Sequence, residues 1–217
     1  EMVHEAKKVG HEYILITDHT RSLAMTGGAD EKKLLRQMKE IDALNKKISG
    51  ITILKGAEVN IMKDGSLDIA DDVLAKLDIA GASIHSHFNL PEKEQTERVI
   101  RAMENPHIDI IFHPTGRSVM KREPIRLDFG KLFRAAKRTR TILEINAHPQ
   151  RLDLNGELIR KAKEYGVKFA INTDAHAVSE LHYLEYGIAQ ARRGWARRED
   201  IINTYPLKKM LSFLKRT

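Results

Sequence analysis

Short apolar segments rich in isoleucine and valine alternate with longer, charged segments of helical periodicity along the chain. Parallel strands covered on both faces give near-continuous apolar runs, and the helices that connect them are amphipathic. The alternation therefore predicts an α/β fold built on a parallel sheet. The predicted strands are residues 13–17, 51–59, 77–84, 108–112, 141–145 and 167–172. The predicted helices are residues 30–48, 68–76, 91–104, 128–138, 154–165, 178–192 and 206–215.

The 217 residues contain no linker, low-complexity segment or internal repeat, so we expect one domain over residues 1–217. Residues 2–9 have helical periodicity, but Glu1 gives this helix no good cap, which indicates a fragment of a longer protein, truncated at its N-terminus. The sequence has neither a signal peptide nor an apolar run of roughly 18 residues. We therefore expect no membrane span and a cytoplasmic location.

The absence of cysteine, set against ten histidines, restricts the metal chemistry of the chain. It excludes a disulfide framework, a thiolate zinc finger and a cysteine nucleophile. A transition-metal site must therefore use imidazole and carboxylate ligands, which suit zinc, manganese or iron.

Each of the six predicted strands ends in histidine or a carboxylate. These ends are Asp18-His19, Glu58, His85-Ser86-His87, His113-Pro114, the segment from Glu144 to His148, and Asp174-Ala175-His176. Because parallel strands place their carboxyl ends on one rim, where barrels build their active sites, these groups are expected to converge. Several such ligands allow two or three ions, an arrangement that suits displacement at phosphorus.

An isolated histidine at a strand end is more often a cap or a surface residue, but six successive strands that end alike indicate a joint site. The predicted metal ligands are His19, Glu58, His85, His113, Asp174 and His176. His87 and His148 lie just past their strands, where they face solvent or substrate. Asp18 and Glu144 are expected to be structural or to orient ligand imidazoles.

The strand-end motifs carry a resemblance that covers essentially the whole chain. In order, they are ITDHT, LKGAEVNI, ASIHSHFNLP, IIFHPTGR, LEINAHPQRLDLN and INTDAH. This series resembles the polymerase-and-histidinol-phosphatase (PHP) phosphoesterase superfamily. TDHTRSLAMTGG, HSHFNLP, HPTGR and ARRGW further resemble the C-terminal PHP domain of bacterial and archaeal family X DNA polymerases. The resemblance implies a distorted, TIM-like (β/α)7 barrel with a trinuclear manganese or zinc centre.

Carried over by motif, the resemblance implies that Glu58 bridges two ions. It implies that His19 and His176 hold one ion, that Asp174 binds beside the bridge, and that His85 and His113 complete another site. The family's opening His-x-His motif belongs to a strand before residue 1 and is absent. We therefore expect six strands instead of seven, a complete site at Glu58, His85 and His113, and fewer ions than in the intact domain.

The resemblance also implies an activity, metal-dependent hydrolysis of phosphoesters, with 3′-5′ exonuclease or other 3′-end processing of DNA. Glu58, Asp174 and His176 are the predicted catalytic residues, in a site where a metal-activated water attacks phosphorus. Arg117, Arg151 and His87 are the predicted substrate-binding residues. For the two arginines, salt bridges to rim carboxylates are the alternative.

Two other functions stay open, a small-molecule phosphatase of the histidinol-phosphatase type and a catalytically silent, metal-binding structural module. The predicted partners are DNA 3′ ends and polymerase domains in the parent chain. The net charge of +7 is uneven, since residues 112–140 hold nine basic and two acidic side chains and residues 187–217 hold eight and two. Such segments attract a phosphate backbone, although solvated helix faces also account for them.

Overall fold

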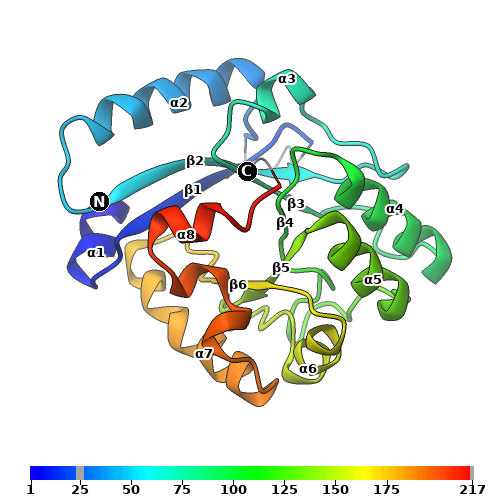
Figure 1. The fold of residues 1–217 in the computed structure, drawn as a ribbon. Helices are drawn as coiled ribbons and strands as arrows, with labels where there is room; N and C mark the ends of the chain where they lie inside the picture. The colour runs from blue at the N-terminus through cyan, green and yellow to red at the C-terminus, as the bar shows by residue number, and fades with distance from the viewer. Residues whose placement is uncertain (23–26, 216–217) are drawn as a thin grey trace.

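The computed structural model describes residues 1–22 and 27–215 and contains one sheet of six parallel strands (Figure 1). The strands follow one another in the sheet in sequence order. They are β1 (Tyr13–His19), β2 (Thr52–Asn60), β3 (Ile79–Ser83), β4 (Ile110–Ile111), β5 (Ile142–Asn146) and β6 (Phe169–Asn172). All six predicted strands are thus confirmed. Residues 23–26 of the TDHTRSLAMTGG motif lie outside the described residues.

Helices connect the strands and surround the sheet (Figure 1). They are α1 (Met2–Lys8), α2 (Glu31–Asn45), α3 (Asp71–Leu74), α4 (Glu92–Glu104), α5 (Phe129–Thr139), α6 (Gly156–Glu164), α7 (Leu184–Arg193) and α8 (Leu207–Leu211). Short 3-10 segments are η2 (Val178–Tyr183), η3 (Arg198–Asp200) and η4 (Ile202–Thr204). None of the described helices has both the length and the apolar character that crossing a membrane requires.

Several helix starts follow from side-chain caps. Asp30, Asp128 and Asn155 each accept a hydrogen bond from the backbone N–H three residues on, which satisfies a donor that the first turn leaves free. The predicted helix 178–192 is wrong in one respect, since it divides into η2 and α7. The predicted helices 68–76 and 206–215 are also too long, because only α3 and α8 within them are α-helical.

The sheet curls into a half-barrel, as expected for an α/β fold of this type. β1 and β6 are not paired with each other in the described part of the chain, so one side of the curl stays open. The free edge of β6 is covered by the Asn203 side chain, which accepts from Ile171 N at 3.1 Å and donates to Ile171 O at 2.7 Å. These two bonds satisfy backbone groups that a sheet edge exposes. A seventh strand before residue 1 stays a prediction.

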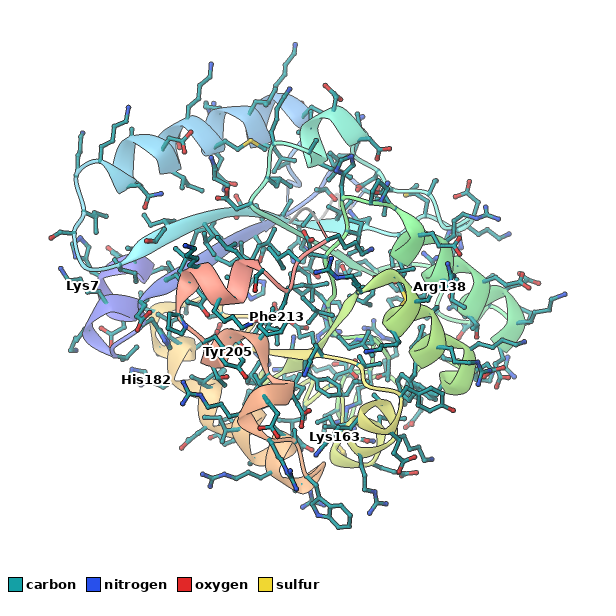
Figure 2. All side chains as sticks on the ribbon, viewed as in Figure 1. Lys7, Arg138, Lys163, His182, Tyr205 and Phe213 are labelled. Carbon is teal, nitrogen blue, oxygen red and sulfur yellow. The ribbon has the colours of Figure 1, made fainter. Side chains whose placement is uncertain are left out.

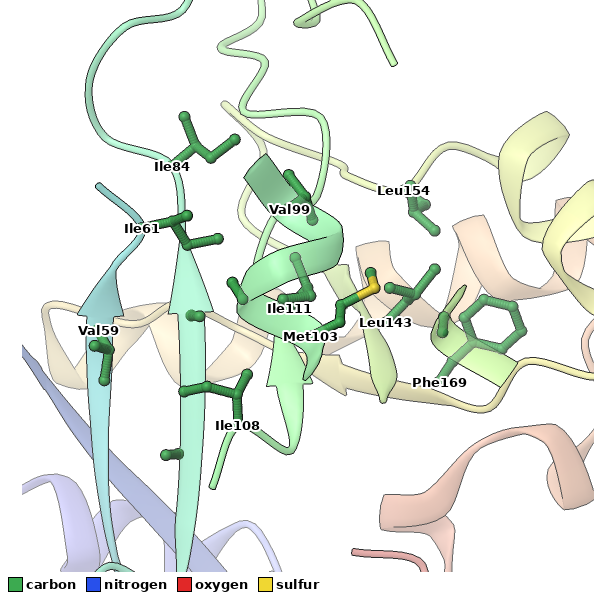
Figure 3. Packing of buried hydrophobic residues seen from close by; sticks show 14 of the residues in the cluster. Val59, Ile61, Ile84, Val99, Met103, Ile108, Ile111, Leu143, Leu154 and Phe169 are labelled. Atoms are coloured by element: carbon green, nitrogen blue, oxygen red, sulfur yellow. The ribbon is translucent and has the colours of Figure 1, made fainter. Parts of the chain in front are cut away.

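The apolar core has two parts, one on each face of the sheet. The outer part lies between strands and helices, where Ile111, Leu143 and Phe169 pack with Val99 and Met103 of α4 (Figure 3). The inner part lines the concave face of the sheet. It consists of Leu54, Ile79, Ile110, Phe112, Ile142, Ala170, Ile202, Met210 and Leu214. Residues of α8 therefore close the amino-terminal end of the half-barrel, beside Tyr205 and Phe213, whose ring centroids are 5.6 Å apart (Figure 2).

Inward-facing positions change from apolar to polar along β2, β5 and β6. On β2, Leu54 belongs to the inner core and Glu58 is the polar residue four positions on. Ile142 is followed by Glu144 on β5, and Ala170 by Asn172 on β6, at the two-residue period that keeps side chains on one face. The half-barrel thus has an apolar floor, and its polar groups gather at the carboxyl ends of the strands.

Replacement of Gly81 by alanine is expected to lower the free energy of unfolding by about 1–3 kcal/mol. A Cβ at this position would lie 2.0 Å from Cε2 of Phe112, whose ring fills the inner core. Urea denaturation measures the effect. Gly130→Ala in α5 is the matched control, because its added Cβ would meet Asp128 Oδ1 at 3.4 Å. Equal stability of the two variants would contradict the crowding at Gly81.

Candidate metal centre at the carboxyl ends of the strands

Three imidazoles surround one buried carboxylate at the polar end of the half-barrel. Glu58 Oε1 lies 2.8 Å from His113 Nε2 and 3.1 Å from His85 Nε2, and Glu58 Oε2 lies 3.3 Å from His19 Nδ1. The sheet register places His19 beside Glu58, at the ends of β1 and β2. His85 and His113 follow β3 and β4. The structure therefore brings four of the six predicted ligands together.

Burial and hydrogen bonding set the protonation of this cluster. Burial opposes ionisation of Glu58, but hydrogen bonds from His113 and His85 outweigh it and hold the pKa of the carboxyl well below its usual value. Burial lowers the pKa of His85. For His113, burial acts in the same direction, but the hydrogen bond to Glu58 outweighs it and raises the pKa. An ionised carboxylate beside a neutral His85 has the protonation state that metal ligation requires.

The donor set fits a transition-metal ion. Donor atoms of His19, Glu58 and His85 all lie within 4.8 Å of one another. His19 Nδ1 and His113 Nδ1 are buried and have no hydrogen-bond partner among the described residues. Buried polar atoms are rarely left without partners, so these two nitrogens are available for a further electrophile. Imidazole nitrogens with a carboxylate oxygen are ligands that zinc and manganese accept.

Asp174 and His176 lie at the edge of this cluster. The His176 ring centroid is 6.0 Å from that of His19, and its side chain is 65% exposed. His176 Nδ1 lies 2.8 Å from the backbone oxygen of Asp174, and Asn146 Nδ2 donates to Asp174 Oδ2 at 3.1 Å. The structure thus places both residues beside the three-histidine group, with His176 open to whatever enters the site.

Three of the strand-end residues have left-handed backbone conformations. The φ angles are +53° at His87, +27° at His113 and +53° at Asp174. Residues other than glycine seldom adopt such angles, and strain of this kind concentrates at functional sites. None of these positions holds glycine or asparagine, so the left-handed conformations could not be predicted from residue type.

A chain of hydrogen bonds behind His85 was not predicted. His85 Nδ1 lies 2.7 Å from Asn60 Oδ1, which leaves Nε2 facing Glu58. Asn60 Nδ2 in turn donates to Asp68 Oδ2 at 2.8 Å and to Thr20 Oγ1 at 2.9 Å. Asp68 also accepts from Thr20 Oγ1 at 2.7 Å. This chain fixes the orientation of the His85 ring. Its residues lie on three different segments, and only the fold brings them together.

Glu144 is buried next to the cluster and is hydrogen-bonded to one backbone N–H and two side-chain amides, while no imidazole nitrogen bonds it among the described residues. It accepts hydrogen bonds from His113 N at 2.6 Å, Asn146 Nδ2 at 3.1 Å and Asn172 Nδ2 at 2.8 Å. Burial nevertheless raises the pKa of Glu144 to about 7. Asn146 Nδ2 also donates a hydrogen bond to Asp174 Oδ2. Glu144 and Asn146 therefore link the ends of β4 and β5 to the loop after β6.

The three predicted substrate-binding residues have different surroundings. Arg117 donates to the carbonyl oxygens of Arg151 and Leu152 and so holds the loop after β5. Arg151 Nε lies 3.9 Å from Asp174 Oδ2, at the edge of the cluster. His87 is exposed, and its carbonyl accepts from Gln95 Nε2 at 2.8 Å. Of the outlying residues, Asp18 accepts from Gln37 at 2.6 Å on the outer side, and His148 lies 3.9 Å from Glu180.

A cavity of about 770 Å³ connects the cluster to the floor of the half-barrel. Its walls include Glu58, His113 and Asp174 at one end and Ile79 and Met210 at the other. It also runs along the unpaired edges of β1 and β6. The polar groups of the cluster therefore line a space that is continuous with the open side of the sheet.

Comparisons with known proteins show relatives over the whole chain. No family model matches. The chain is 45% identical over 216 residues to a DNA polymerase/3′-5′ exonuclease of Bacillus subtilis, covering 100% of this chain but 38% of that protein. It is 33% identical to a probable phosphatase of Thermoanaerobacter sp., covering 99% of this chain and 86% of the phosphatase.

A solved structure shares the fold. It is a histidinol phosphate phosphatase from Lactococcus lactis in complex with zinc, L-histidinol and phosphate. The TM-score is 0.57 at 15% sequence identity, and the match covers 88% of this chain and 86% of that chain. This comparison supports the barrel-like α/β architecture.

Replacement of Asn60 by alanine is expected to weaken Mn²⁺ or Zn²⁺ binding by about 10- to 100-fold, because the His85 ring loses the acceptor that orients it. Titration calorimetry measures the affinity, and thermal unfolding of the metal-free variant tests for loss of fold. Asp64→Asn is the matched control, since its exposed carboxylate bonds Ser66. Unchanged affinity in a folded Asn60→Ala variant would contradict the orienting role.

Glu144→Gln is expected to flatten the pH dependence of stability in the metal-free protein. The folded-state pKa of about 7 exceeds the ordinary value of 4.5, so the folded chain binds more protons between these pH values. The contribution of Glu144 to stability is therefore fully present below about pH 4.5 and is lost as the pH rises through about 7. Chemical denaturation at about pH 5 and pH 8 tests this, and equal pH slopes for the two proteins would refute it.

Proposed function

The chain belongs to the polymerase-and-histidinol-phosphatase superfamily of metal-dependent phosphoesterases, and we propose that it hydrolyses phosphodiesters at the 3′ ends of DNA. One observation carries the choice of substrate. Identity is 45% to the polymerase/3′-5′ exonuclease and 33% to the probable phosphatase, each over essentially all of this chain. The parent protein would then be a family X DNA polymerase, with polymerase domains as partners in the same polypeptide.

His19, Glu58, His85 and His113 would hold the metal ions. The two oxygens of Glu58 face different imidazoles, which is the arrangement a carboxylate needs to bridge two ions. When bound, such ions neutralise charge on phosphoryl oxygens and lower the pKa of a water molecule. We propose manganese or zinc as the metal, with up to three ions in the intact domain.

The residues at the edge of the cluster would act on the substrate. Asp174 and His176 complete the proposed ligand set, and the exposed His176 ring lies where a phosphoester enters. Arg151 and the exposed His87 would contact non-bridging phosphate oxygens. Arg117 would support this contact by donating hydrogen bonds to the backbone oxygens of Arg151 and Leu152.

A second candidate is a small-molecule phosphatase of the histidinol-phosphatase type. The match to 86% of the probable phosphatase favours it. The third candidate is a catalytically silent metal-binding module, and the experiment must distinguish it from both enzymes. The expected cytoplasmic location stays a prediction.

The test compares two substrates on the full-length protein loaded with Mn²⁺ or Zn²⁺, a 3′-labelled oligonucleotide and histidinol phosphate. We expect release of 3′ nucleotides, abolished by chelation and lowered at least about 100-fold by Glu58→Gln, because the variant loses a negatively charged ligand. Glu97→Gln, an exposed carboxylate of α4, is the control and should keep full activity. Hydrolysis of histidinol phosphate alone would refute the DNA proposal, and no turnover of either substrate would refute the enzyme.

A further inference from the structure

A tight turn projects from the rim beside the metal centre. It comprises Ser118 to Arg122 and is named here the rim turn. Lys121 N and Arg122 N both donate to Ser118 O, at 2.9 and 2.7 Å, and Ser118 N donates back to Arg122 O at 2.9 Å. These bonds close a short two-stranded turn that begins five residues after the candidate ligand His113.

The rim turn is fastened to the loops that follow two other strands. Val119 N donates to Gln150 O, in the loop after β5, at 2.7 Å. The Arg122 guanidinium lies 3.8 Å from the centroid of the Phe88 ring, in the loop after β3, and donates to Gly116 O at 2.8 Å. The turn is therefore held in place on the same rim as the cluster.

Met120, at the tip, departs from two rules of local structure. Its side chain is 99% exposed, so a large apolar group packs against nothing in the described chain. Its φ of +61° occupies the third position of a turn closed by Lys121 N and Ser118 O, where glycine or asparagine is normal. The backbone conformation alone costs of order 1 kcal/mol. Neither departure stabilises the fold, and both present the methionine outward.

The charge around the tip favours a polyanion. Lys121 and Arg126 are exposed close to the tip in sequence, with the exposed Glu123 between them, and residues 117–126 hold four basic side chains and one acidic one. An apolar tip with cationic flanks is the composition of side-chain wedges that proteins insert between base steps, while neighbouring cations hold the phosphates.

The metal centre is recessed. Glu58 is 5% exposed and His113 is 2% exposed, so the cluster lies below the rim surface. Enzymes that act on a recessed site in this way extrude the target nucleotide from its stack, so an unstacked 3′-terminal nucleotide would reach this cluster more readily than a paired one. An apolar group on the rim that stacks on the remaining duplex end would favour this separation.

We propose that the rim turn is a wedge, with Met120 stacking against the terminal base pair of duplex DNA so that the 3′ strand separates and enters the metal centre. This inference rests on the proposed hydrolysis of DNA 3′ ends. If it is correct, Met120 determines how well the protein hydrolyses duplex 3′ ends relative to single-stranded 3′ ends.

Met120→Gly in the full-length, metal-loaded protein tests the wedge. Glycine suits the left-handed position, so the variant should unfold at the same or a higher temperature than the wild type. The ratio of the rate on a blunt duplex end to the rate on the same single strand is expected to fall at least about tenfold. A terminal 2-aminopurine should also brighten on binding of the wild type and brighten less with the variant. Leu44→Ser, an exposed apolar residue of α2, is the matched control and should leave the ratio unchanged.

The outcomes separate the wedge from the function on which it rests. If the wild type releases 3′ nucleotides and Met120→Gly keeps the duplex to single-strand ratio, the wedge is refuted and the DNA proposal stands. If the variant instead loses contact with another domain of the full-length protein at an unchanged ratio, Met120 is a docking residue and the wedge is again refuted. If the wild type releases no nucleotides from either DNA, the proposed function itself fails.

Discussion

The organisation of this half-barrel depends on the burial of the Glu58 carboxylate among three imidazoles. A buried charge without partners costs several kcal/mol, so the carboxylate requires donors or cations on every side. His85 and His113 donate hydrogen bonds to it, and His19 Nδ1 lies 3.3 Å from the other carboxylate oxygen without forming one. The register of β1 against β2 places His19 beside Glu58, and His85 and His113 follow the ends of β3 and β4. A metal ion that replaces the protons of this cluster would enter a site whose shape the carboxylate already dictates.

The apolar residues of the inner core lie below the cluster formed by Glu58 and the three imidazoles. Phe112 crosses the curl where Gly81 leaves room for its ring, and Met210 of α8 closes the end of the half-barrel. The walls of the cavity below Glu58 and Glu144 are therefore largely apolar, and such surroundings strengthen electrostatic interactions within the cluster. The same burial has a cost, since it raises the pKa of Glu144 to about 7 and leaves two histidine nitrogens without partners.

The periodicity of the sequence was enough to predict the six strands and the four residues of the central cluster, because strand period and strand ends are local signals. Contacts between distant segments were not predictable in this way. Asn60 and Asp68 have no metal-ligand spacing, and only the fold aligns them behind His85. Arg117 was predicted from its type and its position after a strand, yet its type does not reveal that its donors meet backbone carbonyls.

Backbone strain in this chain is concentrated where the chemistry lies. Of the residues other than glycine with positive φ, His87, His113, Met120, Leu152 and Asp174 all belong to loops that follow strand ends. The positive φ angles at His113 and Asp174 place these side chains at the cluster, where His113 contacts Glu58 and Asp174 contacts Asn146. These contacts offset the backbone strain. At Met120 the positive φ accompanies the hydrogen bonds that close the turn, but the exposed side chain contacts no group of the described chain. An apolar side chain held in the solvent by an ordered turn becomes stabilising only when a partner buries it, which is why the rim turn points to a ligand that arrives from outside.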